Sequence, residues 1–233
     1  VSGTPLLLVE LENRAQTTIS LVHFNISTGT GRELYTEHND CWINLHHLFY
    51  GYPASYKSDD SNDNKNNDDS NMSFVYGSEK DGFMHLYHFN WNVNEQGPAT
   101  MSEQLTNGTL ITESIVKVSP KSNIILFMGT DTEEAPLERH LYSTALIGSA
   151  ANAQKLTKLT KESGVHNLTV NGNLTRAIDV YSSAAIPPTV TLCSLSLNES
   201  NDLSKIQLLY TAVLPERLTP FIRPPELSEF KGP

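Results

Sequence analysis

The chain has 233 residues, of which 38% are hydrophobic, and a formal net charge of −10. Its 16 Lys and Arg residues are dispersed, which argues against a nucleic-acid-binding surface, because a phosphate backbone needs clustered positive charge. No segment approaches the roughly 18 apolar residues of a membrane-spanning helix, and the length permits a sizeable core.

The first residues carry no basic flank, and Glu10 and Glu12 interrupt their apolar run, so we expect no signal peptide and a chain that begins within a longer protein. Cys41 and Cys193 lie far apart, with no C-x-x-C pattern, which indicates neither a disulfide framework nor a metal site. We expect no cofactor. N-x-S/T sequons begin at Asn25, Asn71, Asn107, Asn167, Asn173 and Asn198 and leave the cellular compartment open.

Short apolar runs with alternating polarity recur from the N-terminus onward, and helix signals are nearly absent. Residues 6–11 and 17–25 predict a hairpin, residues 33–36 a third strand and residues 42–50 a fourth. Together they are expected to form one sheet.

Residues 58–71 are almost entirely Asp, Asn, Ser and Lys. Such a composition buries too little apolar surface to offset the entropy of ordering, so we expect a disordered loop insertion. A calcium site is the alternative, since Asp and Asn oxygens suit a hard cation, but the glycine turn and distal Glu of an EF-hand loop are missing.

Further strands are predicted beyond this loop. They cover residues 74–76, 84–89, 114–118, 124–129, 140–146, 155–160, 167–170, 176–182 and 189–195, where the series is expected to end. Between two of them, Asn171-Gly172 predicts a tight hairpin turn with positive φ angles.

One sequence pattern repeats at a spacing of about 55 residues. His85-Leu86-Tyr87 returns as His140-Leu141-Tyr142, and each copy follows a charged, turn-prone segment. Units of about 40–55 residues made of short strands are typical of β-propeller blades, whereas a chance repeat within a β-sandwich is the alternative. For His85 and His140 we expect a strand-end hydrogen bond in each blade rather than metal ligation.

Several segments follow one another in the order and spacing of the dipeptidyl peptidase IV-type propellers. They are Asn13-Arg14-Ala15-Gln16, Trp42-Ile43-Asn44, residues 78–87, residues 136–142, and Tyr181-Ser182-Ser183 followed by Pro187-Pro188. The chain resembles this family over nearly its whole length, and is most similar to its dipeptidyl peptidase 8 and 9-like branch.

The resemblance implies an all-β fold, a partial β-propeller with about four antiparallel blades of an eight-bladed ring. Residues 1–195 would form the blades and residues 196–233 the linker towards an absent α/β-hydrolase domain. A serine hydrolase of that fold needs G-x-S-x-G, which does not occur in this sequence. We therefore assign no catalytic residue.

The family's segment that reaches towards the substrate cavity aligns with residues 42–53. This alignment implies that His46 and His47 line the cavity and contact the peptide substrate. The alternative is that both are surface loop histidines hydrated by water.

Three classes of function remain open at this stage. The first is the non-catalytic propeller of a serine-type dipeptidyl peptidase, capping its active site and gating peptides; the second is a stand-alone propeller that binds proteins. A lectin-like or adhesive β protein is the third. The family resemblance further implies a cytoplasmic location, the hydrolase domain of the same parent protein as a partner, and a homodimer of the intact enzyme.

Overall fold

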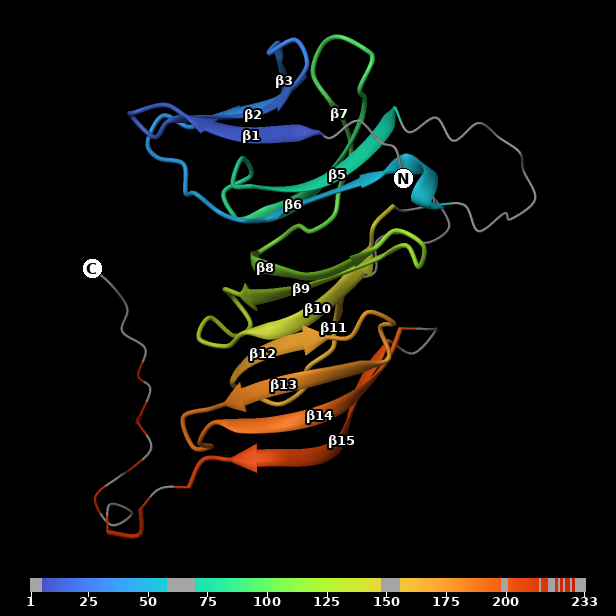
Figure 1. The fold of residues 1–233 in the computed structure, drawn as a ribbon. Helices are drawn as coiled ribbons and strands as arrows, with labels where there is room; N and C mark the ends of the chain where they lie inside the picture. Colours follow the sequence, from blue (N-terminus) through green and yellow to red (C-terminus); the bar gives the residue numbers. More distant parts are fainter. Residues whose placement is uncertain are drawn as a thin grey trace, which may run out of the picture. The chain divides into compact units, whose positions relative to one another are not determined.

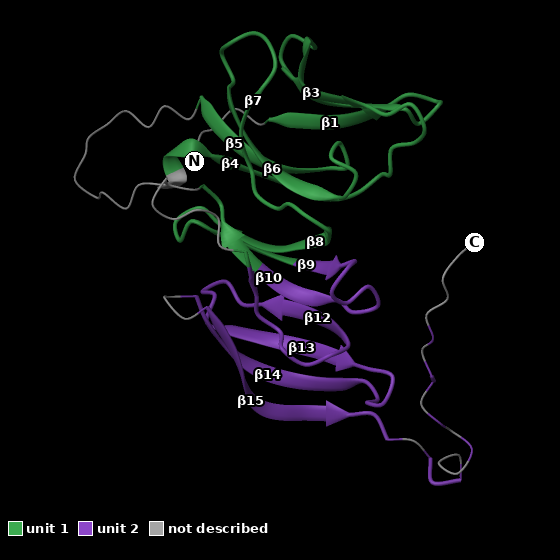
Figure 2. Cartoon of the chain, turned by 180° about the vertical axis from the view of Figure 1, so that it is seen from behind, with its two compact units in different colours: residues 1–127, 143–156 green, residues 128–142, 157–233 purple. Residues whose placement is uncertain are grey.

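The computed structural model describes residues 6–57, 70–147, 156–197, 201–213 and 215–217, and beyond these 221, 223, 225, 226 and 228. The chain divides into two compact units, residues 1–127 with 143–156 and residues 128–142 with 157–233 (Figure 2). Four sheets follow one another along the sequence (Figure 1). Among the described residues there is no α-helix, only the 3₁₀-helix η1, Ala54–Lys57.

Each sheet is a meander of consecutive strands, as expected of a propeller blade. The first sheet contains β1 (Leu7–Glu12), β2 (Thr18–Phe24) and β3 (Gly31–His38), and the second contains β4 (Phe49–Pro53), β5 (Asn71–Ser78), β6 (His85–Asn92) and β7 (Thr100–Gln104). The third contains β8 (Leu110–Ser119), β9 (Ile124–Asp131), β10 (His140–Ala145) and β11 (Thr157–Lys158). The fourth contains β12 (Val165–Val170), β13 (Arg176–Ser182), β14 (Thr189–Ser196) and β15 (Asp202–Thr211). The all-β fold of about four blades is confirmed.

The burial of the strands explains their sequences. β5 and β9 are buried along most of their length and are correspondingly apolar, since both faces of these central strands are covered. In β13 buried and more accessible residues alternate, as expected for a strand with one covered face. Unit 1 has an aromatic core that joins the first two sheets, formed by Leu21, Leu34, Phe74, Tyr76, Tyr87, Phe89 and Trp91.

The prediction of one strand over residues 42–50 is wrong. Residues 42–48 have no regular secondary structure, and β4 begins only at Phe49 and pairs with β5 of the second sheet. The apolar residues mislead here because Ile43 and Leu48, the buried ones, are anchored separately and do not form one face of a strand. The first sheet consequently has three described strands.

The expected end of the strands at residue 195 is also wrong, because β15 adds a fourth strand beside β14. It lies inside the stretch expected to be linker, and its mainly exposed residues gave no alternating pattern. β7, a short polar strand, was not predicted. The polar loop over residues 58–71 lies outside the described residues except for its last two positions, of which Asn71 begins β5.

The turn at Asn171-Gly172 differs from the predicted two-residue type. It spans residues 171–175, and the positive φ, 57°, falls on Leu174. The Asn171 side-chain oxygen accepts hydrogen bonds from the N–H groups of Thr175 and Arg176, at 2.9 and 3.1 Å. The same arrangement recurs between β1 and β2. There Asn13 is the acceptor and Gln16 has the positive φ, 56°. The two turns share the pattern Asn-x-x-x-Thr, and in each the Asn amide also donates to the Thr hydroxyl.

His85 and His140 make the strand-end hydrogen bonds that the sequence predicted. His85 Nδ1 lies 3.2 Å from the Thr106 hydroxyl, which also accepts a bond from the Leu86 N–H at 3.0 Å. His140 repeats both contacts with Thr160, at 2.9 Å for Nδ1 and 3.1 Å for the Leu141 N–H. The hydroxyl donates to the imidazole while it accepts from the backbone.

Replacing Thr160 with Val should lower the free energy of unfolding by about 1–3 kcal/mol, because a buried N–H and a buried imidazole nitrogen lose their partner. Thr106→Val should have a similar effect in the second sheet. Urea unfolding followed by circular dichroism measures both. Thr169→Val, at an exposed position of β12, is the control and should change stability by less than about 0.5 kcal/mol. Equal effects of all three variants would contradict the role of the buried hydroxyls.

Candidate functional site

Residues 41–48, the connection between the first and second sheets, contain both histidines predicted to bind substrate. Backbone and side-chain contacts fix this segment at several points. The Ile43 N–H donates to the Gln16 carbonyl at 2.8 Å, and the Asn44 amide donates to the Glu79 carboxylate at 2.9 Å. Ile43 and Leu48 are buried, at 6% and 2% exposure. The segment is irregular but anchored.

His46 packs inward. Its Nδ1 accepts the Leu48 N–H at 3.2 Å, and its ring meets Tyr76 edge-on with 5.0 Å between centroids. Burial lowers the pKa of His46 and outweighs the nearby carboxylates of Glu10 and Glu37, so the ring is neutral near pH 7. Gly77 makes this packing possible, because a Cβ there would lie 2.8 Å from Leu48 and 3.2 Å from the His46 ring.

His47 is exposed, and two apolar side chains of the same segment are exposed with it. Trp42 is 53% and Leu45 62% accessible. The structure thus separates the two predicted site residues, since His46 packs on Tyr76 whereas His47 is exposed, as are Trp42 and Leu45 of the same segment. Side chains of this type, on an anchored segment, suit contact with a peptide.

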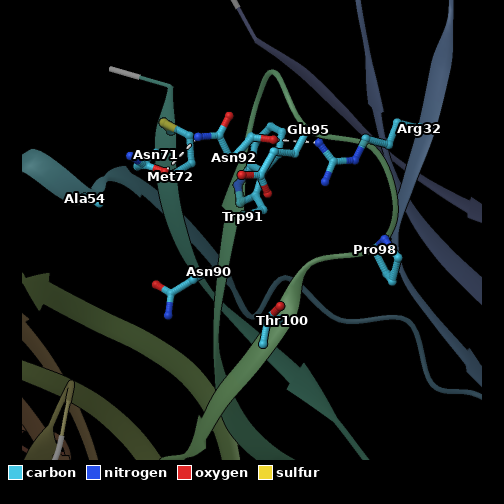
Figure 3. Close-up of a pocket in the computed structure, with 10 residues that line it drawn as sticks. All are labelled: Arg32, Ala54, Asn71, Met72, Asn90, Trp91, Asn92, Glu95, Pro98 and Thr100. Atoms are coloured by element: carbon cyan, nitrogen blue, oxygen red, sulfur yellow. Dashed lines mark hydrogen bonds between the residues drawn. The ribbon is translucent and has the colours of Figure 1, made fainter. Parts of the chain in front are cut away.

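Unit 1 also contains a cavity of about 340 Å³, lined by the second sheet with its connections and by Arg32 of the first sheet (Figure 3). Arg32 is the positively charged side chain in the cavity wall. Its guanidinium already donates to the carbonyls of Asn92 and Gly97, both at 2.6 Å, and lies over the Trp91 ring. Most of the other polar residues that line the cavity are asparagines. The lining residues are Arg32, Ala54, Asn71, Met72, Asn90, Trp91, Asn92, Glu95, Pro98 and Thr100. Neither His46 nor His47 is among them, and no nucleophile with an adjacent base lines the cavity.

A buried ion pair lies in unit 2. His166 Nδ1 is 2.8 Å from Asp179 Oδ2, and His166 Nε2 is 2.9 Å from the Glu162 carbonyl oxygen. Both partners are acceptors, so both ring nitrogens donate and His166 is an imidazolium. Burial lowers the pKa of His166, but the Asp179 carboxylate and the Glu162 carbonyl outweigh it, and the pKa is raised overall. The ring stacks on Tyr181, 4.6 Å between centroids.

The sequence analysis missed both members of this pair, although β13 carries a usable signal. Asp179 stands between Ala177 and Tyr181 in the buried phase of the alternation, where an acidic residue requires a partner. His166 holds the equivalent buried position in β12, next to Leu168. Charged residues at core positions of two paired strands predict contact between them.

The ion pair makes stability depend on pH. A His with a raised folded pKa stabilises the fold fully below its unfolded pKa of about 6.5, and this contribution disappears as the pH rises through the folded value. The unfolding free energy should therefore contain a component that falls from about pH 6.5 upward. Urea unfolding between pH 6 and 9 should show the decline in the wild type and its loss in His166→Gln. The same slope in both proteins would rule out a charged His166.

The described residues contain no group of three or more His, Cys, Asp or Glu side chains placed to hold a metal ion. The calcium hypothesis concerns residues 58–71, which lie almost wholly outside the described part. In the part of the chain that the structure covers, no helix is long and apolar enough to cross a membrane. Cys41 and Cys193 are free thiols, the first exposed and the second buried.

Comparison with known proteins agrees with the sheet architecture. A family profile described as "Dipeptidyl peptidase IV (DPP IV) N-terminal region" matches residues 1–188. Dipeptidyl peptidase 8 of Mus musculus is 25% identical and that of Homo sapiens 24% identical, each over 98% of this chain. The chain spans about a quarter of these relatives, 26% of their length. The matched region and the successive antiparallel sheets together place the chain in the dipeptidyl peptidase IV family, on its dipeptidyl peptidase 8 and 9-like branch.

Proposed function

We propose that this chain is the non-catalytic propeller part of a serine-type dipeptidyl peptidase, whose intact form releases N-terminal X-Pro or X-Ala dipeptides. The observation that carries the proposal is the family match over residues 1–188. The sequence contains no G-x-S-x-G, so the nucleophile would belong to an α/β-hydrolase domain of the same parent protein. This part would cap the active site and gate the entry of peptides.

Within this proposal, His47 contacts the peptide and His46 holds the segment in place. Support comes from the different environments of the two rings, one packed on Tyr76 and the other exposed on the same segment as the exposed Trp42 and Leu45. A neutral, half-buried His46 offers no charge to a substrate near pH 7. The exposed chemistry of the segment is then one imidazole together with the apolar side chains of Trp42 and Leu45, which suits a peptide with apolar side chains.

The remaining partners follow from the same proposal. The intact enzyme would be a cytoplasmic protein that forms a homodimer, as the family resemblance implies. A stand-alone propeller that binds proteins is the competing function, and the exposed Trp42 and Leu45 support it equally, because exposed aromatic and aliphatic anchors are common at protein interfaces. Activity of the parent protein distinguishes the two.

The decisive experiment uses the full-length parent chain with chromogenic Gly-Pro and Phe-Pro amides, with and without a covalent serine-hydrolase inhibitor. We expect inhibitable cleavage. His47→Ala should raise KM about 3–10-fold and leave kcat within about twofold, because it removes one contact made equally in the ground and transition states.

His46→Ala is the matched control in the same segment. It should lower the melting temperature, since a half-buried ring is lost from the Tyr76 contact, and should not raise KM selectively. Equal kinetic effects of the two variants would contradict the division of roles. A folded parent that cleaves neither amide would favour the protein-binding propeller.

A further inference from the structure

The first strand of the second sheet, β4, pairs with another strand along one edge only. The sheet order is β4-β5-β6-β7, so within the described residues β5 is its single neighbour. An unpaired strand edge presents main-chain N–H and C=O groups that can bond to another extended chain. β4 begins directly after the 41–48 segment, which carries the exposed His47. The pattern of the ladder decides which main-chain groups of β4 lie on the free edge.

The β4–β5 ladder leaves Gly51 on the free edge. The Gly77 N–H donates to the Leu48 carbonyl at 2.9 Å, one residue before β4 begins. In an antiparallel pair, bonded and non-bonded positions alternate along the strand. Tyr50 and Tyr52 therefore bond to β5, whereas the main-chain groups of Gly51 point away from it.

The next ladder of the sheet agrees with this assignment. The Val93 N–H donates to the Ser70 carbonyl at 2.8 Å, so the alternate residues of β5 that follow, Phe74 among them, bond to β6. Phe74 is the residue opposite Gly51. Its main-chain groups are used on the β6 side, and the N–H and C=O of Gly51 consequently have no partner in β5.

In β4, Gly51 is also the residue whose N–H remains available on this edge. The Phe49 N–H donates to the His47 carbonyl at 3.0 Å, and Pro53 has no N–H. The edge therefore offers the N–H of Gly51 as donor and the carbonyls of Phe49, Gly51 and Pro53 as acceptors. Gly51 is exposed, and since glycine has no side chain, the exposed surface is the main chain itself.

This set of groups is complementary to the main chain of an extended peptide. A peptide residue opposite Gly51 would accept a hydrogen bond from the Gly51 N–H and donate one to the Gly51 carbonyl. With five residues and one donor, β4 suits a short flexible chain, because a second folded sheet would leave most of its own edge unpaired. Gly51 is four residues from His47, at most about 14 Å along the chain, so a few extended residues span both.

We propose that a bound peptide adds as a further strand to the free edge of β4, with its main chain bonded to Gly51. This pairing rests on the proposed function, and adds to it that the peptide is held in an extended form by main-chain groups that every sequence shares. The side chains of the peptide then matter at His47, whereas its N–H groups matter at Gly51.

The test measures binding of a fluorescein-labelled decapeptide to the full-length parent chain by fluorescence anisotropy. The peptide begins with Gly-Pro, and the bond after the proline is reduced to CH₂–NH so that it is not cleaved. A series of such peptides carries one N-methyl group each, at successive residues from the fourth onward. N-methylation of a residue that donates to β4 should raise the dissociation constant about 5–10-fold. At the residues between, whose N–H groups point away, the change should be less than about twofold. A uniform effect, or none, would overturn the pairing.

Two variants test Gly51 from the protein side. Gly51→Pro removes the N–H and should preserve the melting temperature, because proline is tolerated where the N–H faces away from the sheet. Gly51→Ala, the matched control, keeps the N–H, and its Cβ would meet the Phe49 ring at 3.3 Å, a side chain that can shift. Gly51→Pro should weaken binding of the unmodified peptide about 5–10-fold and Gly51→Ala less than about twofold. Equal affinities of the two variants would show that the Gly51 N–H is not used.

Cleavage of the Gly-Pro amide, measured in parallel, separates this pairing from the proposed function. Cleavage without the alternating pattern would overturn the pairing and leave the function. The alternating pattern without cleavage would overturn the peptidase function and leave β4 as a peptide-binding edge.

Discussion

A threonine hydroxyl ties the outermost strand to its sheet in two successive blades. Thr106 follows β7 and Thr160 follows β11, and each bonds a histidine together with the N–H of the next residue in the neighbouring strand. These outer strands are short, and β11 has only two residues, so their own ladders supply few hydrogen bonds. The buried hydroxyl extends the pairing by one position before the chain enters the next sheet. The repeated His-Leu-Tyr sequence provides the histidine and the following N–H that this contact uses in both sheets.

In the fourth sheet a buried histidine is held by charge, between β12 and β13. No threonine bonds His166, whose two nitrogens are taken by Asp179 and the Glu162 carbonyl. Separating such a pair is costly, because removal of one partner leaves a buried charge uncompensated. A carboxylate has more acceptor sites than one imidazolium can fill, which explains why Asp179 Oδ1 has no hydrogen-bond partner among the described residues. The ion pair that stabilises the blade therefore also creates its unsatisfied acceptor.

Local pattern predicted most strands, and the failures have identifiable causes. Both ends of β13 were predicted correctly, because the alternation of apolar and polar residues along the strand and the Asn turn before it are both visible in the local sequence. β15 was not predicted because its residues are mainly exposed and show no alternation of apolar and polar side chains. Residues 42–48 were assigned wrongly because they are held by contacts with residues distant in sequence, such as that of Ile43 with Gln16. The positive φ at Leu174 was not predicted, because a leucine does not itself favour this conformation; the signal is the Asn-x-x-x-Thr pattern that the turn shares with Asn13 and Thr17. Of the candidate site, the segment was found from family resemblance, but the inward turn of His46 depends on Gly77, some thirty positions away.

The 41–48 segment shows how an irregular connection gains the rigidity of a strand. Its backbone finds partners outside any ladder, in the Gln16 carbonyl and in the His46 ring that accepts the Leu48 N–H. With Ile43 and Leu48 buried and Asn44 held by Glu79, the backbone that carries the exposed side chains is held in place by the protein itself. A preordered contact surface loses less conformational entropy on binding than a mobile loop does. This makes His47, rather than the buried His46, the position where a substitution would change recognition without first changing the fold.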